Sequence, residues 1–189
     1  MSMCELKLEF KNYNKLQHFS ETGMKCMNCK HYINSYYHHK NCNTVNMYDF
    51  KDEIIDSNFK NMMTYGLNGC VSGFIIYNDN NKTKIWFGHD PDKMKFQLEL
   101  IKKLSNFKKS IKFVYIRGEG GYFKNPGDKY FKEKCINYDE YDKVLSLFDC
   151  KYLIEPYIDI SNNIETSIYV KQEDGNLYYT NYLGNYLKV

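Results

Sequence analysis

Several common features are missing from this sequence. It has no alanine, one arginine and one tryptophan, and no run of the roughly 18 apolar residues that a membrane-spanning helix requires. The first residues alternate charged and apolar side chains and lack the apolar core of a secretory signal. A net charge of +3 is too small to indicate nucleic acid as a partner. These absences predict a cytoplasmic protein without a membrane or nucleic-acid partner, and they leave its oligomeric state open.

The composition that is present fits one globular domain. Hydrophobic residues make up 43% of the chain and charged residues 26%, which is ordinary for a globular protein. A chain of 189 residues is long enough for one well-packed core, and no repeat or low-complexity linker divides it. We therefore expect a single domain over residues 1–189.

Hydrophobic periodicity predicts mixed α and β structure. Strands are indicated at residues 3–10, 70–77, 82–88, 110–116, 151–160 and 165–171, and from residue 177. Helices are predicted over residues 91–107 and 139–149. In the first helix, Asp90 is the expected N-cap. Its expected apolar face consists of Met94, Leu98, Ile101 and Leu104. The hairpins favour an α+β fold, a mixed and largely antiparallel β-sandwich flanked by helices.

One predicted hairpin carries a cysteine and a histidine near its two ends. A four-residue turn at residues 78–81 places Cys70 directly opposite His89. Opposed residues have Cβ atoms about 4.5–5.5 Å apart and point to the same face. A neighbouring imidazole activates a thiol whose ordinary pKa is about 8.5. Gly69 allows a tight turn, and the Cys70 amide is a candidate oxyanion donor. The alternative is a small buried cysteine beside a hydrogen-bonded histidine at a strand end.

The residues around Cys70 resemble a known enzyme family. Residues 67–70, LNGC, match the Leu-x-Gly-Cys motif of the cysteine glutamine deamidase toxins, which include the cytotoxic necrotizing factor catalytic domain and the Burkholderia lethal factor. Residues 64–71, TYGLNGCV, are similar to the Thr-x-Gly-Leu-Gly-Ser-Cys-Val run of the chemotaxis receptor deamidases, although Asn-Gly replaces Gly-Ser. The match covers residues 64–90, and a looser one extends through the glycine-rich RGEGG at residues 117–121.

In these families the cysteine is the nucleophile, a downstream histidine is its base, and a threonine or a backbone carbonyl orients the histidine. The resemblance therefore implies that Cys70 is the nucleophile, His89 the base and Thr64 the orienting residue. Leu67 and Gly69 would belong to the oxyanion loop. The implied activity is deamidation of a glutamine on a protein partner by a toxin-like effector, with no cofactor for catalysis. The same residue types also serve proteases, transglutaminases and other thiol acyltransfer enzymes.

A second cluster of reactive residues occupies residues 24–43. It contains a Cys-x2-Cys pair followed by histidines and another cysteine, a pattern that can close a tetrahedral zinc site. The candidate ligands are Cys26, Cys29, His38 or His39, and Cys42. The alternative is a solvated loop rich in cysteine and histidine. A bound zinc would stabilise a region that has little apolar surface to bury.

The zinc hypothesis supports a competing function. The chain would then be a zinc-stapled, non-enzymatic module whose lysines and aromatic residues bind nucleic acid or protein. The single arginine, Arg117, follows a predicted buried strand, where it could hold a carboxylate of the protein or of a partner. A structural role at the strand end is the expected one.

Overall fold

The computed structural model describes residues 25–26, 31–32, 42–67, 69–119, 138–157, 167–182 and 185–189. These residues form two compact units whose segments interleave along the sequence. Unit 1 consists of the described residues within Met1–Thr44, Lys60–Gly66 and Asp159–Val189, and unit 2 of those within Val45–Phe59 and Leu67–Ile158. The expected single-domain organisation stays a prediction.

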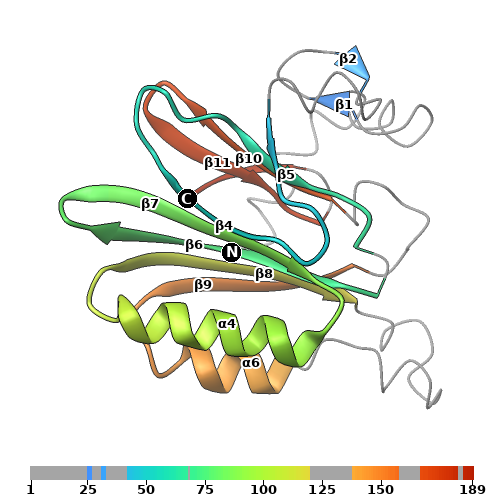
Figure 1. The fold of residues 1–189 in the computed structure, drawn as a ribbon, viewed down its shortest axis with the longest axis vertical. Helices are drawn as coiled ribbons and strands as arrows, with labels where there is room; N and C mark the ends of the chain where they lie inside the picture. The colour runs from blue at the N-terminus through green and yellow to red at the C-terminus, as the bar shows by residue number, and fades with distance from the viewer. Residues whose placement is uncertain are drawn as a thin grey trace, which may run out of the picture. The chain divides into compact units, whose positions relative to one another are not determined.

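Unit 2 is built on a five-stranded sheet in the order β4-β7-β6-β8-β9 (Figure 1). Its strands are β4 (Phe50–Ile54), β6 (Val71–Asp79), β7 (Lys82–Asp90), β8 (Ile111–Glu119) and β9 (Lys151–Tyr157). Neighbouring strands are antiparallel except β8 and β9, which are parallel and require a crossover connection. Helix α6 (Tyr138–Leu145) lies in that connection. Strand β8 extends into the start of the predicted glycine-rich loop, because Arg117 and Gly118 continue the pairing with β6.

Unit 1 contains a second five-stranded sheet in the order β12-β11-β10-β5-β3. Its strands are β3 (Asn43–Thr44), β5 (Met62–Thr64), β10 (Ile168–Glu173), β11 (Asn176–Thr180) and β12 (Tyr186–Lys188). A short antiparallel pair, β1 (Lys25–Cys26) and β2 (His31–Tyr32), belongs to the same unit. The expected α+β class with largely antiparallel sheets is confirmed. The packing of the two sheets as a sandwich stays a prediction, and the strand expected at residues 3–10 lies outside the described residues.

Helix α4 (Lys93–Asn106) begins two residues later than predicted. Its N-cap is Asp92, whose carboxylate accepts hydrogen bonds from two amides of the first turn, whereas Asp90 accepts the Asp92 amide at 2.8 Å. The predicted apolar face is correct at Leu104, which is buried, and wrong at Met94 and Leu98, which are exposed. The helix also buries Phe96 and Leu100, which the predicted face did not include.

Both helices cover one face of the unit 2 sheet. Alternate strand residues share a core with side chains of α4 and α6, as the period of two along a strand requires. These strand residues include Val71, Ile75, Trp86, Val114 and Ile116. None of the helices in the described part of the chain is long and apolar enough to cross a membrane.

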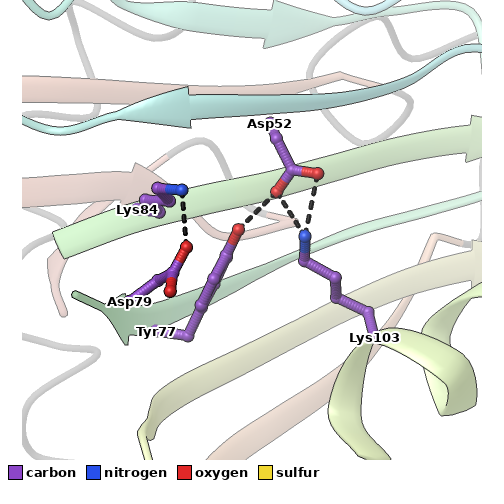
Figure 2. Close-up of polar contacts among 5 residues, drawn as sticks. All are labelled: Asp52, Tyr77, Asp79, Lys84 and Lys103. Carbon is purple, nitrogen blue, oxygen red and sulfur yellow. Dashed lines mark hydrogen bonds and ion pairs between the residues drawn. The ribbon is translucent and has the colours of Figure 1, made fainter. Parts of the chain in front are cut away.

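A polar cluster fixes the turn end of the β6–β7 hairpin against α4. Figure 2 shows Tyr77 and Lys103 converging on Asp52. The Tyr77 hydroxyl donates to the Asp52 carboxylate at 2.6 Å, and the Lys103 ammonium lies 2.7 Å from the same group. A separate ion pair between Lys84 and Asp79, 2.7 Å apart, lies nearer the turn. These contacts tie β4, β6 and α4 together, and the opposite end of the hairpin contains the candidate site.

Candidate active site

The β6–β7 hairpin has a shorter turn than predicted. Asn80 and Asn81 alone connect the strands, with φ angles of 48° and 63°, and positive φ at both positions is characteristic of a two-residue type I′ turn. His89 consequently pairs with Ser72, and not with Cys70 as expected. The predicted direct opposition is therefore wrong. The displacement is two residues along β6, so it does not move His89 to the other face.

Cys70 precedes Val71, the first residue of β6, which pairs with Asp90. It is therefore two residues from Ser72, the partner of His89. In a regular antiparallel pair such an offset corresponds to diagonal neighbours, whose Cα atoms are about 7–8 Å apart. The cysteine and the histidine thus stay in the same corner of the sheet.

A row of polar residues crosses the sheet on the face opposite the helices. Glu155, Arg117, Ser72 and His89 follow one another on β9, β8, β6 and β7, and each is at most 8% exposed. Arg117 Nε donates to the hydroxyl of Tyr115 at 2.7 Å, and that hydroxyl donates to Glu155 at 2.6 Å. The guanidinium is 3.8 Å from the same carboxylate oxygen. Arg117 therefore has the carboxylate partner expected from the sequence, within the protein itself.

A β-bulge opposes His89 just before β4. The His89 amide donates to the Asp49 carbonyl at 3.0 Å, and the Tyr48 amide donates to the His89 carbonyl at 2.7 Å. Tyr48 and Asp49 together therefore pair with the single residue His89. Tyr48 has a φ of 74°, a left-handed conformation that glycine usually adopts in such bulges. The Asp49 amide closes a turn by donating to the Asn46 carbonyl at 3.0 Å. Residues 45–49 are called the bulge segment below.

The imidazole of His89 is neutral at neutral pH. Its 2% exposure causes a desolvation that lowers its pKa to about 4. The negative charges of Asp90 and Asp49 and a hydrogen bond with the Val45 backbone act in the opposite direction. Because that hydrogen bond favours the charged ring, the imidazole is its donor and the Val45 carbonyl its acceptor. A neutral imidazole that donates from one nitrogen has a lone pair on the other, as a general base requires.

The backbone before Cys70 forms a tight turn. The Cys70 amide donates to the Leu67 carbonyl at 3.1 Å, and Gly69 has a φ of 78°. Leu67 is fully buried and anchors the turn. An oxyanion could accept a hydrogen bond from the Cys70 amide only if that amide first released the Leu67 carbonyl. This donor is therefore not preorganised for the predicted role.

The bulge segment contacts both reactive residues. Its Val45 carbonyl accepts a hydrogen bond from the His89 imidazole, and the sulfur of Met47 lies 3.9 Å from the Cys70 sulfur. Cys70 is 2% exposed, whereas Met47 is 48% exposed. One five-residue segment therefore contacts both reactive groups: its half-exposed Met47 side chain touches the thiol, and its Val45 carbonyl bonds to the imidazole.

The other predicted site residues belong to unit 1 or lie outside the described residues. Thr64 is buried in β5 of unit 1, where it pairs with Ile168 of β10, and its role as the orienting residue stays a prediction. Cys42 is buried in the same unit, with its sulfur 3.7 Å from the Tyr169 hydroxyl. Cys29 and His38 lie outside the described residues, and only the backbone of Cys26 is described. Within the described ranges no group of three metal-ligating side chains occurs, and the zinc set stays a prediction.

Sequence reasoning missed Ser72, Glu155, Val45 and Met47 of the site. Ser72 and Glu155 each interrupt an apolar strand, and a polar residue within such a run was a usable signal. Val45 contributes its backbone carbonyl, which has no side-chain signature. Comparison with models of known protein families and with curated protein sequences finds no match to this chain.

Proposed function

We propose that this chain is a cysteine hydrolase of the protein glutamine deamidase type, with Cys70 as the nucleophile and His89 as the general base. The observation that supports it most is the bulge segment, whose Val45 carbonyl orients the imidazole while Met47 contacts the thiol. A backbone carbonyl is one of the two orienting devices in the family that the LNGC motif resembles. In this proposal Val45 takes the role first assigned to Thr64. The substrate would be a protein that presents a glutamine to a toxin-like effector.

The proposed reaction begins with a proton transfer. His89 accepts the thiol proton while the Cys70 sulfur attacks the carbonyl carbon of the glutamine carboxamide. The imidazolium then gives this proton to the leaving nitrogen, ammonia departs, and a thioester remains. His89 next takes a proton from water, whose oxygen attacks the thioester. The products are glutamate on the partner and the regenerated thiol.

The low pKa of His89 specifies how the base would act. A ring with a pKa of about 4 does not stay protonated in the resting enzyme at neutral pH, which disfavours a permanent thiolate–imidazolium pair. Proton transfer would accompany attack on the substrate. The alkaline arm of the pH–rate profile would then follow the thiol, and the acidic arm would lie well below the ordinary histidine pKa of about 6.5.

The first experiment measures the alkylation rate of each cysteine by peptide mass spectrometry. Wild type and His89→Gln would be treated with iodoacetamide between pH 5 and 9. Cys150 serves as an internal control because it is half-buried and packs against the core on the helix-covered face of the sheet, where burial and the Asp149 charge raise the pKa of its thiol. We expect the Cys70 rate at neutral pH to fall in His89→Gln and the difference to narrow toward pH 9, where the thiol ionises without a base, while Cys150 does not change.

A direct test of activity follows. Purified protein and a Cys70→Ser variant would be incubated with a mixture of folded proteins, and peptides would be searched for glutamate in place of glutamine. Conversion that requires Cys70 supports the proposal. If Cys70 is indifferent to His89 and no conversion occurs, the cysteine is a core residue and the competing zinc-stapled binding module becomes the leading hypothesis.

A further inference from the structure

We propose that Met47 is a movable cover over the nucleophile and that a glutamine side chain reaches Cys70 by displacing it. This inference rests on the proposed function for the identity of the substrate. The cover itself depends on geometry alone, so the proposed function and the cover can be refuted independently.

The exposure of the two sulfur-containing residues supports the cover. The Cys70 thiol is 2% exposed, and the Met47 sulfur touches it at 3.9 Å. Met47 is itself 48% exposed, so its side chain extends from the thiol to solvent. A carbonyl carbon can approach the Cys70 sulfur along this route only if the methionine moves.

The backbone beneath Met47 is fixed, which assigns the motion to the side chain. Tyr48 and Asp49 are both hydrogen-bonded to His89 on β7, and the Asn46 amide donates to the Asp49 carboxylate at 3.1 Å. These bonds hold Tyr48 in its left-handed conformation. Methionine has three rotatable bonds and adapts readily to new packing, so a rotamer change is sufficient to uncover the thiol.

The position of the cover also defines how the substrate is presented. Met47 and Tyr48 are neighbouring exposed apolar residues at the tip of the turn, 48% and 59% exposed. A displaced methionine would pack beside the incoming segment. The favoured target is therefore a glutamine that extends from a protein surface next to an apolar residue, because the contact with the partner replaces the Met47–Cys70 contact.

The test compares Met47→Ala with Met47→Leu, which keeps most of the side-chain volume. Iodoacetamide is the probe because it has the same primary carboxamide as glutamine. If the uncovered state has a population of about 10% or less, removing the cover raises the Cys70 alkylation rate about tenfold or more. We expect this acceleration in Met47→Ala, a rate near wild type in Met47→Leu, and no change at Cys150. Met94→Ala removes another exposed methionine, on α4 and outside the bulge segment, and is a matched control that should leave the Cys70 rate unchanged.

Two results would overturn the cover. One is an unchanged Cys70 rate in Met47→Ala, and the other is equal acceleration in the alanine and leucine variants. Repeating the comparison in the His89→Gln background separates the hypotheses. Acceleration by Met47→Ala in that background supports the cover even if His89 proves to be no base. Because Met47 is half-exposed on a turn, its variants should remain folded, and urea denaturation of each variant checks this.

Discussion

The burial of His89 predicts a specific loss of stability in acid. Its pKa falls from an ordinary 6.5 to about 4 in the folded chain, mainly because the ring is desolvated. Below pH 6.5 the unfolded chain takes up a proton on this ring, whereas the folded chain does not do so until about pH 4. Stability therefore decreases as pH falls through this window. At about 1.4 kcal/mol per pKa unit, the complete shift amounts to about 3 kcal/mol.

The measurement is urea unfolding of wild type and His89→Gln at several pH values from 7.5 to 4.5. Carboxylates elsewhere in a chain also contribute to the loss of stability in acid. Histidines elsewhere in the chain contribute as well, and both proteins share all these groups. We expect the wild type to lose about 2–3 kcal/mol more than the variant across this range. Parallel profiles for the two proteins would refute the burial argument and the neutral general base with it.

Three further substitutions test the sheet that supports the site, each by urea unfolding at neutral pH. Gly73→Ala should destabilise by about 3 kcal/mol, because an added Cβ would lie 2.3 Å from the Tyr115 carbonyl oxygen on β8; a loss below about 1 kcal/mol would contradict this contact. Arg117→Met should cost about 3–5 kcal/mol, because it leaves a buried carboxylate without its cation, and a neutral effect would show that the pair is dispensable. Tyr77→Phe should cost about 1 kcal/mol through loss of the 2.6 Å hydrogen bond to Asp52, and a stabilised variant would argue against that bond.

The strands and helices of unit 2 were predictable because their hydrophobic patterns are strong. The hairpin at residues 70–88 and the helix after it were found within a few residues of their bounds. The turn was harder, since residues 78–81 are all good turn formers and the sequence does not say which two adopt positive φ. Ending the first strand at residue 77, two residues before the observed end at Asp79, was enough to give His89 the wrong partner.

Cys70 and His89 could be singled out as candidate site residues from the sequence, whereas the residues that contact them could not. Cys70 and His89 were identified from residue chemistry, spacing and resemblance. The contacts with Val45 and Met47 bring a segment that is distant in sequence against the hairpin, through a backbone carbonyl and an exposed methionine. Neither type of contact leaves a pattern in one sequence. The helix face was mispredicted for a related reason, because several apolar residues on α4 satisfy a helical period and tertiary packing chooses among them.

The polar row from Glu155 to His89 has a consequence for how the sheet reaches its native register. A slip of one residue in β8 would turn Arg117 toward the apolar side chains of α4 and α6, and it would move Ile116 to the face of the polar row. Such a chain would bury a guanidinium away from its carboxylate, at a cost of several kcal/mol. Misaligned strand pairings are thereby penalised during folding. The strand register that positions His89 near the start of β6 is therefore stabilised by an arginine two strands from the imidazole.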